Sequence, residues 1–245
     1  MNYKAVLQYD GTRYRGWQTQ GNTDNTIQGK LETLLTKMAG EPVEVNGSGR
    51  TDAGVHAAGQ VISFRCKTKE SPEEICRYMN EYLPEDIAIL QVEQVDGRFH
   101  SRLNAKSKTY EYRIYKGSKP DVFERRYVWP MEEKLDVAKM REAAGHLTGT
   151  HDFMAFCGNR RMKKTTVRTI YQIEIEETEH EIRMRFTGSG FLQNMVRILT
   201  GTLVEVGRGE RTPEDMERIL ESRDRQQAGF LMPAKGLTLM EVKYK

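Results

Sequence analysis

The sequence predicts an α+β fold made of two ferredoxin-like (βαββαβ) halves, whose strands join into one wide, mostly antiparallel sheet with helices on one face. Strand-like alternation and helical periodicity follow one another in the order strand, helix, strand, strand, helix, strand, and this order then repeats. The 245 residues are 38% hydrophobic and 30% charged, which is typical of a globular chain with a substantial core. We place the halves at 1–104 and 105–245, with the joint in the polar, basic segment near 97–107, and expect a cleft between them.

The first half opens with a strand over 3–9, in which every second residue is apolar or aromatic. A helix is predicted to begin near Asn25, whose side chain can cap it while Gln28 completes a capping box, and to end at Gly40. The apolar stripe of this helix consists of Ile27, Leu31, Leu34, Leu35 and Met38.

The remainder of the first half has the pattern strand, strand, helix, strand. Ser71, followed by Pro72 and then by Glu74, predicts the capped start of the second helix, and Pro84 ends it. The strands around this helix are expected at 43–46, 60–66 and 87–95.

The second half repeats this order with one addition. Helical spacing predicts helices over 135–147 and 192–206, and Thr212 with Pro213 begins a short extra helix. Alternation predicts the strands of this half at 109–115, 167–175, 182–186 and 237–244.

The net charge of +3 is small, but the basic residues are clustered. Such runs are often no more than solvated surface, yet two of them in an acid-rich chain favour a polyanionic partner. One run holds Arg98, His100, Arg102, Lys106 and Lys108, and the other holds Arg160, Arg161, Lys163, Lys164 and Arg168.

Several classes of protein are disfavoured by the sequence. Three scattered cysteines are too few for a disulfide framework, and the five histidines lack metal-ligand spacing, so we predict no metal site. No phosphate-binding glycine motif of the nucleoside triphosphate or dinucleotide type is present. No apolar run approaches the ~20 residues of a membrane span, and the first residues lack a signal-peptide layout. We therefore expect a cytoplasmic protein with no membrane partner.

The segment 49–57 is the most informative stretch of the chain. It places Asp52 two residues after Arg50, on a small-residue loop between two strand-like stretches. Gly49 and Gly54 allow the sharp turns that such a loop needs. The ordinary explanation is a turn whose aspartate caps local backbone amides. The alternative is a single carboxylate presented to a ligand, with a cation close by.

Three other stretches suit nucleotide binding, and each also has an ordinary structural explanation. The segment 9–18 interleaves aromatic residues with arginines, although a well-packed turn with Trp17 as a surface anchor explains it equally well. Tyr110 and Tyr112 fall on one strand face, as they would in a half-buried aromatic face. Arg197 follows a Gly-rich turn in an apolar helix, so it needs a carboxylate partner if it is buried, or else it snorkels to solvent.

The Asp52 loop stands in a fixed order with other short motifs along nearly the whole chain. These motifs cover 9–12, 16–18, 26–28, 31–32, 49–57, 99–100 with Arg102, 108–112, 168–170, 190–192 with 194–197, and Pro233 with 236–237. In order and spacing they resemble the tRNA pseudouridine synthase A family. Ser101 and Met232 stand where alanine is usual in that family, and neither position is expected to carry chemistry.

The resemblance implies an enzyme that isomerises uridine to pseudouridine at nucleotides 38 to 40 of the tRNA anticodon stem-loop, as a homodimer and without a cofactor. Asp52 matches the single catalytic aspartate, and Arg197 matches the arginine that keeps it ionised. Tyr110 matches the tyrosine that stacks on the target base, and Arg50 the arginine that replaces the flipped uridine. The residues implied to contact the RNA are Phe99, His100, Ser101, Arg102 and Leu103, with Arg160, Arg161, Lys163 and Lys164.

Two other classes of function remain open from the residues. A non-catalytic RNA-binding module on ferredoxin-like folds needs exposed aromatics, which Tyr110 and Tyr112 could supply, but it does not need the Asp52 loop. A hydrolase acting on nucleosides would release the free base, and enzymes that hydrolyse glycosidic bonds typically need a pair of carboxyls.

Overall fold

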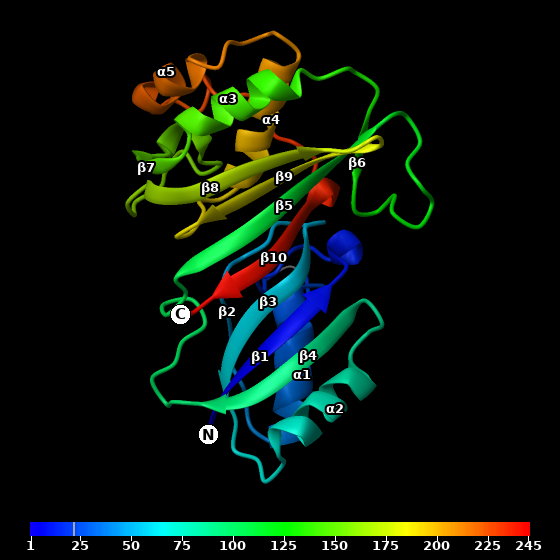
Figure 1. The fold of residues 1–245 in the computed structure, drawn as a ribbon. Helices are drawn as coiled ribbons and strands as arrows, with labels where there is room; N and C mark the ends of the chain where they lie inside the picture. The colour runs from blue at the N-terminus through cyan, green and yellow to red at the C-terminus, as the bar shows by residue number, and fades with distance from the viewer. Residues whose placement is uncertain (22) are drawn as a thin grey trace. The chain divides into compact units, whose positions relative to one another are not determined.

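The structure is a computed structural model that describes residues 1–21 and 23–245. The predicted α+β class is confirmed, and the strand pairing within the sheet is mostly antiparallel. The chain forms two compact units, one made of 1–106 with 238–245 and the other of 107–237 (Figure 1). The sequence placed the division after 104 and assigned the last strand to the second half. That strand instead groups with the first unit, because it pairs with a first-unit strand.

The first unit has the element order of a ferredoxin-like fold. Its sheet order is β4-β1-β3, and β1 is antiparallel to both neighbours. The other edge of β3 pairs with β2 at 62–64 and, in parallel, with β10 at 56–57. The elements are β1 (Asn2–Tyr9), α1 (Ile27–Ala39), β2 (Val45–Gly47), β3 (His56–Arg65), α2 (Pro72–Tyr82), β4 (Ile87–Val95) and β10 (Leu237–Lys243), with a 3₁₀ turn at Gly11–Arg13.

Alternating residues of β1 build the core of this unit, as the sequence predicts. Tyr3, Ala5 and Leu7 are buried, and the ring of Tyr3 stacks on Phe64 of β3 with centroids 5.5 Å apart. Helix α1 lies behind these strands in Figure 1. Its buried residues include Ile27, Leu31 and Leu35, and those of α2 are Ile75 and Met79.

Of the two predicted helix caps, the one at the start of α1 is wrong and the one at the start of α2 is confirmed. Helix α1 is capped by Thr26, whose side chain accepts from the Gly29 amide, and not by Asn25. The Asn25 side chain donates to the Arg13 carbonyl instead, and Gln28 reaches Glu32 and a β2 carbonyl. The predicted capping box of α2, made by Ser71 and Glu74, is present in full.

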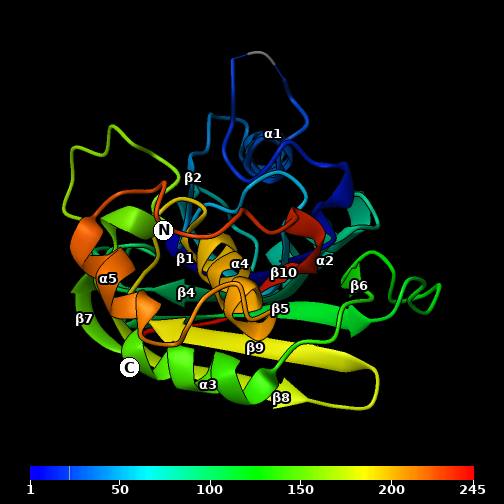
Figure 2. The same cartoon turned by 90° about the horizontal axis from the view of Figure 1, so that it is seen from above.

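The second unit has the strand order β5-β9-β8-β7, antiparallel throughout, and the short β6 runs parallel to β5. Helices α3 and α4 contact one another on one face of this sheet (Figures 1 and 2). Strands β6 and β7 were not predicted. The elements are β5 (Ser107–Lys116), β6 (Trp129–Met131), α3 (Val137–His146), β7 (Gly149–Asp152), β8 (Val167–Glu177), β9 (Glu181–Gly188), α4 (Met195–Gly207) and α5 (Asp215–Ser222), with 3₁₀ turns at Met154–Phe156 and Ala234–Gly236.

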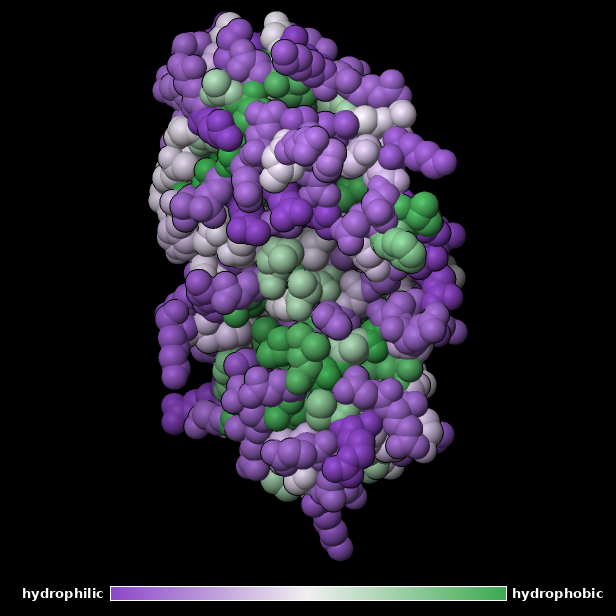
Figure 3. All heavy atoms as spheres, turned by 45° about the vertical axis from the view of Figure 1, so that its right-hand side comes forward, coloured by the Kyte–Doolittle hydropathy of each residue, from purple (hydrophilic) through white to green (hydrophobic). Residues whose placement is uncertain are grey.

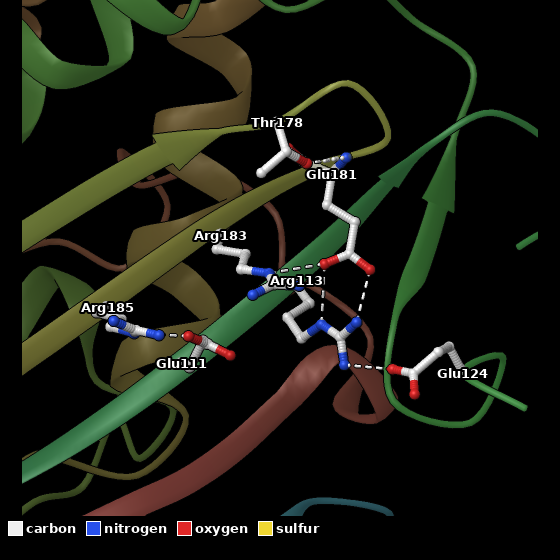
Figure 4. Close-up of polar contacts among 7 residues, drawn as sticks. All are labelled: Glu111, Arg113, Glu124, Thr178, Glu181, Arg183 and Arg185. Atoms are coloured by element: carbon white, nitrogen blue, oxygen red, sulfur yellow. Dashed lines mark hydrogen bonds and ion pairs between the residues drawn. The ribbon is translucent and has the colours of Figure 1, made fainter. Parts of the chain in front are cut away.

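The two faces of β5 and β9 differ in chemistry, because successive strand residues point to opposite faces. Tyr112 and Ile114 are buried on one face. The other face carries an ion-pair network, in which Arg113 donates two hydrogen bonds to Glu181, at 3.0 and 2.6 Å, and a third to Glu124 (Figure 4). Burial raises the pKa of Glu181, but hydrogen bonds from Arg113 and Arg183 outweigh it, so the net pKa is lowered.

No helix in the described part of the chain is long and apolar enough to cross a membrane. On the face drawn in Figure 3, hydrophilic side chains cover the larger area and hydrophobic side chains gather in separate patches.

Candidate active site

The Asp52 loop connects β2 to β3 in the first unit. The Val55 amide donates to the Asp52 carbonyl at 3.1 Å, which closes a tight turn. Gly54 has φ +78° in this turn, a conformation that strongly favours glycine. Asp52 is half-buried, while Arg50 is exposed. The predicted turn is therefore present, and Asp52 is its first residue.

A buried polar cluster lies beneath this loop. Gln60 of β3 is 0% exposed, and its side-chain amide donates to the Gly49 carbonyl at 3.0 Å while its oxygen accepts from Ser48 at 2.6 Å. The Tyr9 hydroxyl forms a 2.8 Å hydrogen bond with Thr51, the residue before Asp52. Burial raises the pKa of Tyr9 to about 12, so its hydroxyl stays neutral at ordinary pH. Buried hydrogen bonds of this kind fix the loop in one position.

The segment before α1 supports the same loop from another direction. The Trp17 amide donates to the Thr51 carbonyl at 3.0 Å. Gly16 has φ +97°, and a Cβ there would lie 3.0 Å from the Thr51 oxygen, so the backbone approach requires glycine. Trp17 is 2% exposed, and its ring leaves no room for a side chain at Gly47.

The prediction that 9–18 offers aromatic rings to a nucleotide is wrong. The alternative of a well-packed turn is present, but Trp17 is buried and is not the surface anchor that this alternative assumed. Tyr14 and Trp17 are both buried, and the Tyr14 hydroxyl donates to Asp86. Arg13 also pairs with Asp86, at 2.7 Å. The aromatic side chains of this segment are therefore packed in the interior beside the Asp52 loop, and they are not available to a ligand.

The far end of the loop is fixed at the start of β3. His56 is buried, and its Nδ1 accepts from the Gly11 amide at 3.1 Å and lies 3.2 Å from an Asp10 oxygen. A Cβ at Gly11 would stand 2.0 Å from the Val55 carbonyl oxygen. The Gly11 backbone therefore packs directly against the end of the loop.

The segment 99–103 follows β4 and is anchored at its middle. Ser101 is 0% exposed, and its hydroxyl donates to the Asn46 carbonyl at 2.5 Å. The ring of Phe99 packs on Tyr244, whose hydroxyl donates to the Ser101 carbonyl. The expectation that position 101 carries no chemistry stays a prediction, but its hydroxyl does hold this segment to β2.

The outer residues of this segment face solvent, and the pKa of one of them, Arg102, is lowered in part by the charge of Arg50 on the Asp52 loop. Arg102 and Leu103 are exposed, Leu103 by 77%. Partial burial and the nearby charge of Arg50 lower the pKa of Arg102. His100 accepts from the Arg102 amide at its Nδ1, which orders the turn. The structure therefore brings together Arg50 and Arg102, two predicted RNA-contacting cations from distant parts of the sequence.

Tyr110 lies on β5 of the second unit. It is 7% exposed, and its ring meets Phe191 edge-on with centroids 5.3 Å apart. Tyr112 is fully buried, and its hydroxyl donates to the Pro233 carbonyl at 2.7 Å. The aromatic face is thus a packed face, and Tyr112 belongs to the core of this unit.

Arg197 projects from the first turn of α4 and is half-buried. Its Nε donates to the Met232 carbonyl at 2.6 Å, and Nη1 lies 3.5 Å from the Asn194 side-chain oxygen. The Met232 amide in turn donates to the Arg197 carbonyl. These bonds hold the guanidinium beside the 232 segment, which argues against simple snorkelling of a loose side chain.

The second basic run lies on the loop between the Met154–Phe156 turn and β8. Arg160, Arg161, Lys163 and Lys164 are all exposed there. The loop is tied to the start of α4 by a 2.8 Å hydrogen bond from the Gly158 amide to the Gln193 carbonyl. Among the described residues, no group of three or more histidine, cysteine, aspartate or glutamate side chains could hold a metal ion.

The predicted site residues therefore fall into two groups. The first unit carries Arg50, Asp52 and the 99–103 segment, and the second carries Tyr110, Arg197 and the basic loop. The sequence analysis missed the support of the Asp52 loop by Tyr9 and Gln60. A glutamine within the otherwise apolar stretch of β3 was the signal that could have found it, since a buried polar side chain needs hydrogen-bond partners.

Comparisons with known proteins agree with the motifs on these elements. A family model described as tRNA pseudouridine synthase matches residues 5–103 and 143–245. The tRNA pseudouridine synthase A of Bacillus sp. (strain KSM-64) is 49% identical over 99% of both chains. The tRNA pseudouridine synthase A 2 of Bacillus anthracis is 46% identical, also over 99% of both. A tRNA pseudouridine synthase A 1 from Clostridium tetani is 44% identical over 99% of both as well.

One solved structure, of a Cbf5-Nop10-Gar1 complex, aligns with 97% of this chain and 48% of its own at 11% identity and a TM-score of 0.40, too low to add to the assignment. The family model and the relatives decide it. The chain belongs to the tRNA pseudouridine synthase A family of isomerases.

Proposed function

We propose that this enzyme converts uridine to pseudouridine at nucleotides 38 to 40 of the tRNA anticodon stem-loop, with Asp52 as its single catalytic carboxylate. The observation that carries the proposal is the Asp52 loop. It combines the family's Arg-Thr-Asp motif with a buried polar cluster and a close glycine contact that fix the turn. Catalytic groups need this kind of preorganisation, because small displacements are costly in rate.

The reaction needs one carboxylate and no redox partner. The bond between N1 and C1′ of the uridine breaks, the base turns, and C5 bonds to C1′. The proton on C5 leaves, and N1 ends protonated, so atoms and electrons balance within the nucleotide. Asp52 acts by attack on C1′ or by removing a ribose proton to give a glycal. A pair of carboxyls to activate water is not required, because the base is kept and water is excluded.

The other residues take the roles that the family resemblance implies, and their chemistry suits those roles. Arg197 pairs with Asp52 and keeps it ionised in a site that excludes water. Tyr110 stacks on the target base, and Arg50 occupies the space that the flipped uridine leaves in the stem-loop. The pairing of Asp52 with Arg197 is part of the proposal.

The RNA backbone is contacted by the 99–103 segment and by the basic loop at 160–164. The exposed Arg102 and its neighbour Arg50 suit phosphate contact, as do Arg160 and Lys163. We propose that the enzyme is a cytoplasmic homodimer and that one tRNA contacts both subunits. Light scattering after gel filtration would give about twice the 28.3 kDa chain mass, and a monomer in the active fraction would contradict this.

The test of Asp52 is the substitution Asp52→Asn, which removes the charge and keeps the shape. We expect pseudouridine formation to be lost and tRNA binding to remain, measured by tritium release from uridine labelled at C5 and by filter binding. Asp24→Asn, at an exposed position before α1, is the matched control and should be as active as the unchanged enzyme. Full turnover by Asp52→Asn would show that Asp52 is not the catalytic carboxylate.

The same assay separates the two other classes of function. RNA binding without tritium release by the unchanged protein would indicate a binding module. Release of free uracil would indicate a hydrolase. Pseudouridine mapping in tRNA from cells that lack and then regain the protein tests the positions 38 to 40 directly.

The two routes at Asp52 differ at the ribose. The glycal route breaks the C2′–H bond, whereas attack on C1′ leaves that bond intact. Deuterium at C2′ of the target uridine should therefore slow turnover severalfold in single-turnover conditions only if the glycal forms.

A further inference from the structure

A pocket of about 450 Å³ opens in the second unit where three segments meet. Its walls come from the basic loop, the start of α4 and the stretch that precedes Met232. The lining residues are Gly158, Arg160, Asn194, Ile198, Arg225, Gln226, Ala228, Gly229, Phe230 and Leu231. We call it the 160/225 pocket.

Two arginines from distant parts of the sequence converge on this pocket. Partial burial and the charge of Arg160 lower the pKa of Arg225. Arg225 is held in place by a 3.2 Å hydrogen bond from Nη1 to the Ala228 carbonyl. Two guanidinium groups at close range repel one another, and an anion between them removes that repulsion.

The acid whose charge acts on Arg225 is already engaged. Glu205 accepts from the Phe230 amide at 3.1 Å with one oxygen and is paired with Arg211 through the other. It raises the pKa of Arg225, but more weakly than Arg160 lowers it. The positive charge that faces the pocket is therefore only partly balanced.

The N-terminal end of α4, which lines the same pocket, also favours a negatively charged ligand. Asn194 occupies the N-cap position of this 13-residue helix with φ +61°, and its side chain makes no capping hydrogen bond. The positive end of a helix dipole favours an anion placed against its first turn. A Cβ at Gly158 would lie 2.5 Å from the Asn194 side-chain nitrogen, so the basic loop packs directly on this cap.

The pocket also adjoins the segment that binds Arg197. The side-chain oxygen of Asn194 lies 3.5 Å from Arg197, and Leu231 immediately precedes Met232, whose carbonyl accepts from Arg197. The wall of the pocket therefore shares Asn194 with the contacts of Arg197, the arginine that we assign to catalysis.

We propose that the 160/225 pocket binds one phosphate group of the tRNA backbone, with Arg160 and Arg225 as its charged ligands. The proposal rests on the assignment of tRNA as substrate, but it adds a residue, Arg225, that the sequence motifs did not single out. Arginine suits the role because its planar group donates two parallel hydrogen bonds to a phosphate.

The test is Arg225→Gln in the full-length enzyme, with the affinity for tRNA measured over a range of salt concentrations. We expect the dissociation constant to rise by about 10-fold at low salt, and the slope of log affinity against log salt to fall by about 1. Arg160→Gln should have the same two effects, and the double variant should lose more than either single one. Arg218→Gln, an exposed arginine on α5 that pairs with Asp215, is the control and should change neither quantity.

The salt slope separates a phosphate ligand from a structural residue. If Arg225 only holds the Ala228 carbonyl, the substitution lowers Tm and leaves the slope unchanged, which overturns the proposal. Inorganic phosphate, compared with chloride at equal ionic strength, should compete with tRNA more strongly in the unchanged enzyme than in Arg225→Gln. Tight binding of uridine 5′-monophosphate that is lost in Arg225→Gln would show a mononucleotide site and also overturn it.

Binding is measured without turnover, so the outcome is independent of the catalytic assignment. An unchanged enzyme that binds tRNA but forms no pseudouridine would contradict the proposed function and leave the 160/225 pocket standing. Normal pseudouridine formation with unchanged salt slopes in both arginine variants would contradict the phosphate site in the 160/225 pocket and leave the proposed function standing.

Discussion

At the scale of single residues, the Asp52 loop shows how a carboxylate is held by groups that do no chemistry themselves. Thr51 is fixed at its side chain by Tyr9 and at its carbonyl by Trp17, and Gly49 is fixed by Gln60. Each bond restrains a residue within three positions of Asp52. The motif itself could be read from the sequence, because glycine, arginine and aspartate are recognisable there. The partners could not, since they come from 11 to 42 residues away.

Tyr9→Phe tests this support. The substitution leaves the Thr51 hydroxyl, which is nearly buried, without its partner, at a cost of about 1–3 kcal/mol in the free energy of unfolding. We expect kcat to fall by about 10-fold or more, because the loop that carries Asp52 loses a restraint. Steady-state kinetics and urea unfolding measure the two effects.

Tyr3→Phe is the matched control for Tyr9→Phe. Tyr3 lies on the same strand and the same face, is equally buried, and donates only weakly, to the sulfur of Met1 at 3.6 Å. Its removal should change neither kcat nor stability by much. Equal kinetics for the two variants would show that the hydroxyl of Tyr9 does not position the loop.

Arg197→Met tests the proposed charge partner of Asp52. The substitution replaces the stem of the side chain with an unbranched apolar chain and removes the cation, so we expect kcat to fall by about 10²-fold or more, since a charge that stabilises the reacting group is lost. It also frees the buried Met232 carbonyl, so Tm should fall by several degrees while the fold survives. Circular dichroism and single-turnover kinetics measure these effects, and unchanged turnover would leave Arg197 with a structural role alone.

At the scale of elements, the first turn of α1 helps to hold the candidate active site in place. The Ile27 and Gln28 amides donate to the Gly16 and Trp17 carbonyls, so the first turn of the helix holds the segment that touches Thr51. The sequence offers Asp24, Asn25 and Thr26 in a row, and any of them can cap a helix. A tertiary contact excludes Asn25 as the cap, because its side chain donates a hydrogen bond to the Arg13 carbonyl, and Thr26 caps the helix instead.

Thr26→Ala and Ser71→Ala form a matched pair of cap removals. Each removes a side-chain oxygen that accepts from a first-turn amide, so each should cost about 1 kcal/mol of stability. We expect kcat to fall by about 10-fold in Thr26→Ala only, because the first turn of α1 holds the segment that supports the Asp52 loop, whereas α2 packs mainly against β4. The free energy of unfolding from urea titration and kcat are measured for both. A similar loss of kcat in both variants would mean that activity follows general stability.

At the scale of the whole molecule, the order of the long elements was predictable and the assignment of the last strand was not. Helices α1 to α4 and the long strands follow apolar periodicity, which is local information. The pairing of β10 with β3 joins Thr238 to His56, and no local pattern records a contact over such a separation. Strands β6 and β7 are short, three and four residues, which is too few for alternation to be recognised.

Buried tyrosines make the stability of the whole chain sensitive to alkaline pH. Burial raises the pKa of Tyr9 to about 12, and it also raises the pKa values of Tyr14, Tyr112 and Tyr244 above their ordinary value of 10.0. The unfolded chain gives up its phenolic protons near pH 10, whereas the folded chain keeps them. The unfolded state then binds fewer protons, so stability is fully present below pH 10 and falls as the pH rises toward 12 and beyond.

We therefore expect the free energy of unfolding to fall between pH 10 and 12, with Tyr9 alone contributing on the order of 2 kcal/mol at the upper end. Urea titrations at a series of pH values measure this, and the part of the tyrosinate absorbance that comes from the buried tyrosines should appear together with unfolding. Tyr9→Phe should flatten the pH dependence, because it removes one buried phenol, while Tyr171→Phe, at a position 55% exposed on β8, should leave it unchanged. Tyrosinate absorbance from Tyr9 in the folded enzyme near pH 10 would contradict the burial argument and, with it, the neutral hydroxyl that holds Thr51 beside Asp52.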